Sequence, residues 1–172
     1  MSDMHILRAA SLSSKVFTKD ILQRATRDGY GDGLVELGAK NPDVVVLCGD
    51  LKESTRAEWF EKKYPDRFIE AGIAEQNMAA MAAGLALQGK IPFVATYAVF
   101  CPGRNWDQVR ISICYQNLPV KLSGAHAGIS VGPDGATHQA MEDIALTRVL
   151  PNMTVLVPCD AEEARKAVHA AA

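Results

Sequence analysis

Residues 67–78 of the chain read RFIEAGIAEQNM, and a run of small residues from Ala79 to Ala86 follows them. This pattern predicts a short extended segment, a turn at Gly72 and then a tightly packed helix. Glu75 is therefore expected at a strand-to-helix junction, where open parallel sheets place their ligands. Its carboxylate would lie near the positive end of a helix dipole and beside apolar residues that desolvate it. The alternative is an ordinary acidic residue in the first turn, where such side chains favour the dipole.

The composition is that of one globular domain with a sizeable core. The chain has 172 residues, a net charge of -2 and 48% apolar residues, and this charge gives no sign of a nucleic-acid partner or of an anionic membrane. Its four cysteines (Cys48, Cys101, Cys114 and Cys159) form no CxxC pair. We therefore expect a reduced, cytoplasmic protein. No apolar run approaches the roughly 20 residues of a membrane span, and no signal peptide is evident.

Apolar runs and helical patterns alternate along the rest of the chain. The expected strands, besides the segment before Gly72, are Val44–Cys48, Ile91–Thr96, Leu118–Leu122 and Thr154–Val157. The expected helices are Thr18–Ala39, Glu53–Lys63, Arg104–Gln116, Thr137–Leu150 and a last one that Asp160 caps. This order predicts an α/β fold with a parallel sheet and right-handed crossovers. Residues 1–17 show no clear period and are interpreted as an N-terminal arm, followed by one domain over residues 18–172.

Several separated motifs carry a resemblance to a known family. They occur in the expected order and read ATRDGYGDGLVELG, GDLKEST, GIAEQNM, ATYAVF, HAGISVGPDGATHQ and LPNMTVLVPCDAEEA. From Ala25 to Ala172 the chain resembles the pyrimidine-binding domain of transketolases. The resemblance implies a three-layer thiamine diphosphate-binding fold of the pyrimidine type, built on a parallel sheet.

The resemblance also implies a set of residues around the cofactor. In the family, the Glu at the position of Glu75 hydrogen-bonds the aminopyrimidine ring and promotes its imino form. The implied catalytic residues are Glu75 and His138, and the implied cofactor contacts are Asp50, Leu51, Glu75, Tyr97, Phe100 and Trp106. From the residues alone, Asp50 could equally be a helix cap, and Phe100 and Trp106 could be core residues. Gly103 stands where some family members have a third aromatic residue.

A second implied group would bind the sugar phosphate. It consists of Arg27, Ser54, His126, Asp134 and His138. Arginine suits phosphate because of its planar fork of donors. Taken alone, the histidines could be structural and Arg27 a solvated helix charge. We expect no metal site, since the residues form no closed ligand set.

The triplet Gly31-Asp32-Gly33 imitates the metal-diphosphate motif of thiamine enzymes. It lies in a helical pattern, however, and no Asn follows it at the required distance. We therefore expect a partner, an N-terminal transketolase subunit, to supply the Mg²⁺ and diphosphate site. A homodimer core is also expected, built on the Met78–Leu87 helix, which is apolar nearly all round and should be buried on every side. The chain stops inside an alanine-rich helix, which we interpret as a fragment or a minimal subunit.

The implied activity is transfer of a two-carbon ketol unit from a ketose phosphate to an aldose phosphate, inactive in the isolated chain. Two alternatives remain: a subunit resembling deoxyxylulose-phosphate synthase, and a non-catalytic dimerisation or regulatory module of the same fold.

Overall fold

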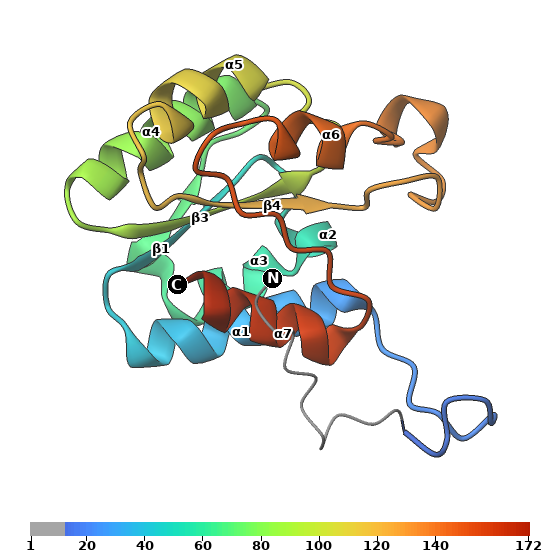
Figure 1. Cartoon of the computed structure of the whole chain (residues 1–172). Coiled ribbons are helices and arrows are strands. Elements are labelled where there is room, and N and C mark those ends of the chain that lie inside the picture. The colour runs from blue at the N-terminus through green and yellow to red at the C-terminus, as the bar shows by residue number, and fades with distance from the viewer. Residues whose placement is uncertain (1–12) are drawn as a thin grey trace, which may run out of the picture.

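The computed structural model describes residues 13–172 and has a four-stranded parallel sheet at its centre (Figure 1). The strands are β1 (Val44–Cys48), β2 (Phe68–Glu70), β3 (Ile91–Tyr97) and β4 (Lys121–Ala125). They lie in the order β2-β1-β3-β4, and every neighbouring pair is parallel. The predicted α/β fold with a parallel sheet is confirmed. Of the expected N-terminal arm, residues 1–12 lie outside the described residues and residues 14–17 form a turn.

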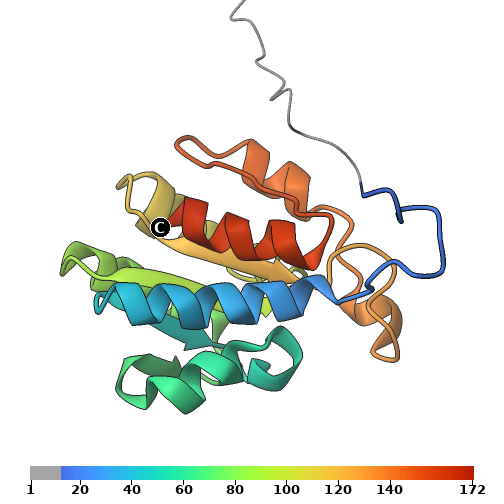
Figure 2. The same cartoon turned by 90° about the horizontal axis from the view of Figure 1, so that it is seen from below.

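Helices cover both faces of the sheet and make three layers (Figure 1). One layer contains α1 (Thr26–Lys40), α3 (Ala57–Lys63) and α7 (Ala161–Ala171), and Figure 2 shows α1 and α7 side by side. The opposite layer contains α4 (Glu75–Leu87), α5 (Trp106–Gln108), the π-helix η2 (Val109–Cys114) and α6 (Asp143–Arg148). The short helix α2 (Lys52–Thr55) follows β1, and the 3-10 turns are η1 (Pro65–Arg67) and η3 (Gly135–His138).

Strand β1 divides the hydrophobic core because both of its faces are buried. Val44 and Val46 pack with Leu34 of α1 and Phe60 of α3. The other face of β1, with Val45 and Leu47, packs against Met78 and Ala82 of α4. A strand between two helical layers needs apolar side chains at every position, so its sequence is a continuous apolar run.

Glycines allow α1 to pack closely on α7. A Cβ atom added to Gly29 would lie 1.7 Å from the carbonyl oxygen of Ala161, and one on Gly33 would lie 2.9 Å from Val168. The Gly31-Asp32-Gly33 triplet lies inside α1, as the sequence pattern predicts. Its glycines therefore serve helix packing in this structure.

Two expected elements are corrected where they begin. The first helix begins at Thr26 instead of Thr18, and the Thr18 hydroxyl donates a hydrogen bond to the carbonyl of Lys15 instead of capping a helix. Strand β4 begins at Lys121 instead of Leu118, because a turn brings the N–H of Val120 to the carbonyl of Leu118.

Other expected elements are broken or missing. The helix expected over Glu53–Lys63 is two helices, because Arg56 adopts a left-handed conformation with φ of 66°. Only the η3 turn and α6 are helical within Thr137–Leu150, and α5 with η2 replaces the single helix expected over Arg104–Gln116. The strand expected over Thr154–Val157 is wrong: this segment joins no strand of the described sheet, and Val157 is 68% exposed.

Helix α4 is buried on one side only within the chain. Met78, Ala79, Ala82 and Ala83 are buried, whereas Ala80, Gly84 and Leu87 are exposed along the opposite side. The expected burial on every side is therefore not met by this chain alone.

Candidate active site

A cleft of about 160 Å³ opens at the carboxyl ends of the strands. Its lining comes from the loops that follow all four strands, and consists of Gly49, Asp50, Leu51, Ile73, Glu75, Phe100, Arg104 and His138. Parallel sheets place their ligands at this edge because the strands all end there. Four of the six sequence motifs, far apart in the chain, therefore meet at one place.

Glu75 is the first residue of α4, and its side chain is only 1% exposed. The Arg104 guanidinium donates a hydrogen bond of 2.8 Å from Nη1 to the Glu75 Oε2 atom. The Asn105 side chain donates one of 3.1 Å to the Glu75 carbonyl oxygen and is itself fully buried. A buried carboxylate needs such partners, since desolvation of an unpaired charge costs several kcal/mol. Neighbouring residues thus hold Glu75 by both its side chain and its backbone.

An aromatic wall stands beside Glu75. Phe100 is half-buried, and the Arg104 guanidinium carbon lies 4.4 Å from the centre of its ring. The His138 ring meets Phe100 edge-on with centroids 5.4 Å apart, and Tyr97 lies parallel to Phe100 at 6.2 Å. The cleft therefore combines a buried carboxyl group with one aromatic face, which suits a flat heteroaromatic ligand.

Glu70, at the end of β2, fixes two of the loops that form the cleft. One of its carboxylate oxygens accepts hydrogen bonds from the N–H groups of Asp50 and Gly72. Asp50 does not cap a helix: the N-cap position of α2 is Leu51. The helix-cap alternative for Asp50 is therefore wrong.

A second cluster centres on Ser54. The Ser54 and Tyr97 hydroxyls are 2.7 Å apart, and the Ser54 carbonyl accepts a hydrogen bond of 3.3 Å from Arg27. The His126 Nε2 atom lies 3.4 Å from the same carbonyl. Burial lowers the pKa of His126 below its ordinary value of 6.5, and the Arg27 charge lowers it further, against the raising effects of the Ser54 hydrogen bond and of Asp134. Arg27, Ser54 and His126 are thus brought together next to the aromatic wall.

Two of the expected site residues, Trp106 and Asp134, do not line the cleft. Trp106 donates a hydrogen bond of 2.8 Å to the Leu146 carbonyl and packs against the core cluster of Val109 and Leu150 instead of lining the cleft. Asp134 lies exposed on the loop before η3.

The structure adds three residues that sequence reasoning missed: Glu70, Arg104 and Asn105. Glu70 and Glu75 are both acidic residues beside the Gly72 turn, and only the second was singled out. The usable signal for Arg104 and Asn105 was their position in the loop that follows β3, at the sheet edge where parallel sheets place their ligands.

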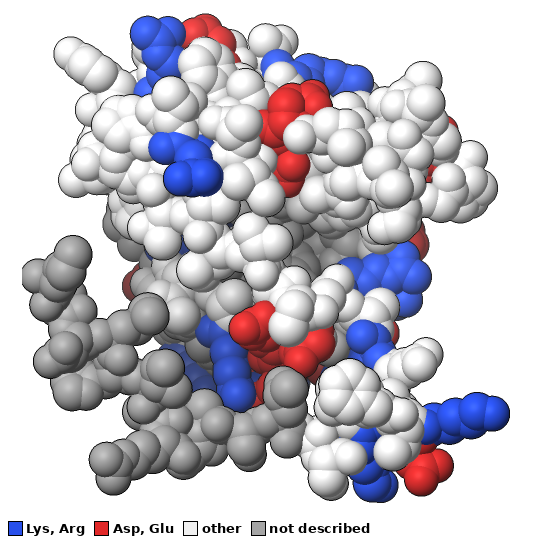
Figure 3. Space-filling view, turned by 45° about the vertical axis from the view of Figure 1, so that its right-hand side comes forward, with Lys and Arg blue, Asp and Glu red and all other residues white. Residues whose placement is uncertain are grey.

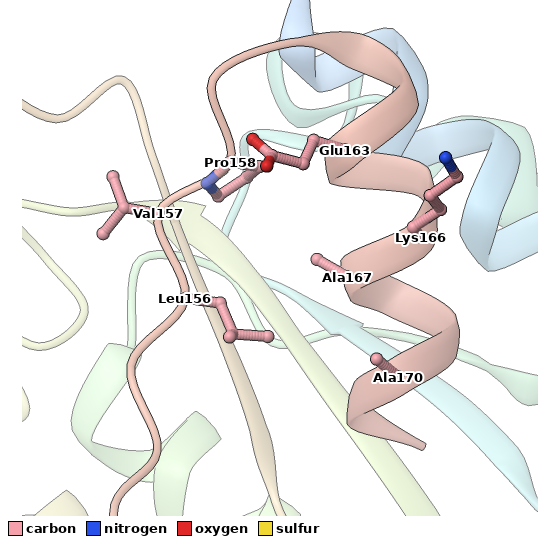
Figure 4. Close-up of a pocket in the computed structure, with 7 residues that line it drawn as sticks. All are labelled: Leu156, Val157, Pro158, Glu163, Lys166, Ala167 and Ala170. Atoms are coloured by element: carbon pink, nitrogen blue, oxygen red, sulfur yellow. The ribbon is translucent and has the colours of Figure 1, made fainter. Parts of the chain in front are cut away.

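The remaining surface offers less chemistry. Figure 3 shows Lys, Arg, Asp and Glu scattered among uncharged residues on one face. A mostly apolar hollow of about 250 Å³ lies between Leu156 and Val157 and the α7 residues Ala167 and Ala170 (Figure 4). Among residues 13–172, no group of three His, Cys, Asp or Glu side chains could hold a metal ion. Over the same residues, every helix is too short or too polar to cross a membrane.

Comparison with known proteins shows the family of the chain. Residues 23–172 match the family described as transketolase, pyrimidine binding domain. The chain belongs to this family. It is 50% identical over 137 residues to a Methanocaldococcus jannaschii protein assigned as a transketolase C-terminal section, covering 80% of this chain and 43% of that protein. It is 43% identical over 149 residues to human transketolase, covering 86% of this chain and 24% of the human protein.

Solved transketolase structures share the fold. A structure described as a split gene transketolase, inactive beta4 tetramer, superposes with a TM-score of 0.77 at 53% identity, and covers 87% of this chain and 48% of that one. The transketolase of Campylobacter jejuni superposes with a TM-score of 0.78 at 30% identity, covering 86% and 23%. The chain therefore spans less than half the length of these relatives.

The transketolase family uses thiamine diphosphate, and the cleft fits one end of it. The aminopyrimidine needs a carboxyl group at its edge and an aromatic surface on its face, which Glu75 and Phe100 provide side by side. No described cluster suits the Mg²⁺ and diphosphate end.

Proposed function

We propose that the chain is the pyrimidine-binding part of a split, thiamine diphosphate-dependent transketolase of the cytoplasm. That enzyme, once assembled with a partner subunit, transfers a two-carbon ketol unit from a ketose phosphate to an aldose phosphate. The observation that carries the proposal is the buried Glu75 carboxylate beside the face of Phe100, at the carboxyl ends of a parallel sheet.

Each cluster has its own part in this function. Bound thiamine diphosphate supplies the electron sink for the two-carbon unit. Glu75 holds a proton against a ring nitrogen, Phe100 supports the ring, and Asp50 and Leu51 close the other side of the cleft. His138, on the same wall, orients the donor sugar together with Asp134. Since Arg27, Ser54 and His126 converge beside Tyr97, they hold the substrate phosphate.

The diphosphate and Mg²⁺ come with a partner subunit in this proposal. The support is the Gly31-Asp32-Gly33 triplet, which lies within α1 and packs against neighbouring helices, so it is not placed to bind a metal. The chain with its partner should bind thiamine diphosphate tightly in the presence of magnesium. The isolated chain should bind it weakly and show no ketol transfer.

A homodimer core is proposed for the exposed side of α4. Ile73 and Leu87 are 73% and 60% exposed at its two ends, and Ala80 and Gly84 between them leave room for close approach. Light scattering should show a dimer or larger assembly, and Leu87→Glu should shift it toward the monomer. A wild-type chain that runs as a monomer at micromolar concentration argues against this face.

The assembled complex tests the proposal. The chain is co-expressed with an N-terminal transketolase subunit, and ketol transfer is measured with ketose and aldose phosphates. Glu75→Gln should lower turnover by at least about 100-fold, since positioned acid–base groups contribute factors of this size. The control is Glu162→Gln on α7. Like Glu75, Glu162 pairs with an arginine: its carboxylate lies 2.7 Å from the Arg165 guanidinium, but it is exposed and outside the cleft.

Near-normal turnover of Glu75→Gln would remove the proposed role of this residue. Two other outcomes select the alternatives. Activity that requires pyruvate as donor would indicate a synthase-like enzyme, and a complex that forms without binding thiamine diphosphate would indicate a non-catalytic module.

A further inference from the structure

The Glu75 carboxylate and the Phe100 ring face are already contacted by a side chain of the same protein. Arg104 donates its 2.8 Å hydrogen bond to Glu75 and places its guanidinium 4.4 Å from the Phe100 centroid. The same side chain lines the cleft. A guanidinium is flat and rich in N–H donors, so it offers Glu75 a donor and Phe100 a stacking surface at the same time. The carboxyl group and the ring face are the two groups that an aminopyrimidine would contact here, with a proton held between Glu75 and a ring nitrogen.

The two partners of this ion pair differ in their freedom to move. The Arg104 side chain is 45% exposed, whereas that of Glu75 is 1% exposed. The Arg104 side chain can therefore rotate out of the cleft and its guanidinium can be hydrated by solvent. Glu75 is fixed by the fold and by the Asn105 hydrogen bond to its carbonyl. Separation of the pair without a replacement would leave a buried carboxylate unpaired, which is strongly unfavourable.

Gly103 explains why the position beside Phe100 is filled by Arg104. A Cβ atom on Gly103 would lie 2.1 Å from the Val99 carbonyl oxygen, so the backbone here leaves no room for any side chain. The turn that brings Gly103 against Val99 continues with a hydrogen bond of 3.0 Å from the Arg104 N–H to the Phe100 carbonyl. Because of this turn, the Arg104 side chain lies over the Phe100 ring.

We propose that Arg104 is a positioning residue that occupies the aminopyrimidine site of the cofactor-free chain and is displaced when the ring binds. It stabilises the buried Glu75 charge until the ring binds, when a proton from solvent, held between Glu75 and the ring nitrogen, replaces the arginine cation and the ring replaces the guanidinium on Phe100. This inference rests on the proposed function, since it assumes that the aminopyrimidine of thiamine diphosphate binds between Glu75 and Phe100. Its consequence is that Arg104 weakens cofactor binding by the isolated chain.

Calorimetric titration of the isolated full chain with thiamine tests the competition. Thiamine carries the aminopyrimidine but not the diphosphate, so the titration does not depend on the partner's metal site. Arg104→Met keeps an unbranched side chain and removes the charge. We expect it to bind thiamine about threefold to fivefold tighter than wild type, the range for loss of a partly exposed ion pair. Arg104→Lys, which keeps a positive charge near Glu75, should fall between the two.

The matched control is Arg110→Met. Arg110 is another exposed arginine from the same stretch, and its guanidinium lies 5.8 Å from the Trp106 ring, away from Glu75. It should leave thiamine affinity unchanged. In a Glu75→Gln background, Arg104→Met should no longer increase affinity, because the ion pair is already absent. General damage to the fold would lower affinity, so a gain cannot come from it.

A second measurement needs no ligand. Arg104→Met should lower the free energy of unfolding of the wild-type chain more than that of the Glu75→Gln chain, since the two residues are coupled. Additive effects of the two substitutions on the free energy of unfolding would contradict the proposed coupling between Arg104 and Glu75. Equal or weaker thiamine binding by Arg104→Met, or no binding by either chain at millimolar thiamine, would overturn the competition. If the complex nevertheless catalyses ketol transfer, only the inference on Arg104 fails and the proposed function stands.

Discussion

Glu70 accepts a hydrogen bond of 2.7 Å from the backbone N–H of Asp50, and the same oxygen accepts one of 3.0 Å from Gly72. One carboxylate therefore joins the loops that follow β1 and β2. Both loop residues adopt left-handed conformations, with φ of 58° at Asp50 and 68° at Gly72. The non-glycine Asp50 is strained in this conformation, and the Glu70 hydrogen bond helps to hold it there.

Glu70→Ala should loosen both loops while the fold persists. The two N–H groups can bond to water instead, because Glu70 is exposed, so we expect a loss of unfolding free energy of about 1 kcal/mol or less. Hydrogen exchange of the Asp50 and Gly72 amides should become faster. Glu70→Gln keeps a carbonyl oxygen in place and serves as the control. Unchanged exchange in Glu70→Ala would show that the loops hold their shape without this residue.

Tyr97→Phe removes one partner of the 2.7 Å hydroxyl pair with Ser54. The lost hydrogen bond should cost about 1 kcal/mol of stability. Because Ser54 also carries the carbonyl that Arg27 and His126 contact, KM for a phosphorylated substrate should rise more than kcat falls. A double-mutant cycle with Ser54→Ala measures the coupling. An equal rise of KM for a substrate without phosphate would contradict the assignment of this cluster to the phosphate.

The pKa of His126 should lie below 6.5 in the folded chain, and NMR titration of its ring protons measures this. Burial is the main cause and the Arg27 charge a smaller one, so Arg27→Met should raise the pKa of His126 toward 6.5. A lowered histidine pKa means that the unfolded chain binds more protons than the folded chain between the folded pKa and 6.5. Stability should therefore decrease as the pH falls through this window. A His126 pKa above 6.5 would be the opposite result.

A charged cluster joins the two neighbouring helices α1 and α7. Glu36 accepts hydrogen bonds of 2.9 Å from His169 and from Arg165. Both bonds lower the pKa of Glu36 below 4.5, and the bond from His169 has the larger effect. A lowered carboxyl pKa stabilises the fold above pH 4.5, and this stability is lost as the pH falls through the folded pKa. The Glu36 carboxyl is 42% exposed, so solvent screening limits the contribution to less than about 1 kcal/mol. Thermal unfolding of Glu36→Gln should show a smaller difference from wild type at pH 3 than at pH 6.

Gly29→Ala should destabilise the chain by at least about 2 kcal/mol, since the added methyl would enter the backbone of Ala161 and push α7 away from α1. Gly84→Ala is the matched control in another helix, where nothing lies within 4 Å of the added Cβ. In a monomeric chain it should stabilise by up to about 1 kcal/mol, because alanine favours the helix. Chemical denaturation measures both variants. Equal effects would mean that helix propensity, and not the close approach of α1 and α7, governs these sites.

The sequence predicted the sheet best where burial controls the pattern. Val44–Cys48 lies between two helical layers, so every side chain is apolar and the strand was placed at its exact bounds. Thr154–Val157 is also mostly apolar but does not pair with the described sheet, because an apolar composition alone does not determine whether a segment finds a strand to pair with. Arg56 broke a helix through its backbone conformation, which its side-chain type gives no reason to expect.

For the site, sequence reasoning found the residues that a family motif marks, and the structure brings Asp50, Glu75, Phe100 and His138 to one cleft. It missed contacts that depend on three-dimensional pairing, such as that of Arg104 with a carboxylate 29 residues away. For Trp106, sequence reasoning left two possibilities, a cofactor contact and a core residue. The hydrogen bond from its indole N–H to the carbonyl of Leu146, 40 residues away, holds the side chain against a core cluster, and this contact could not be predicted from the sequence.

The lining of the cleft has a thermodynamic consequence. Gly49, Glu75, Phe100 and His138 follow four different strands, so the cleft exists only when the whole sheet has formed. A molecule that occupies it is linked to the global unfolding equilibrium and not to the ordering of a single loop. Melting-temperature shifts of the intact chain can therefore serve as a screen for such molecules, without any enzymatic readout.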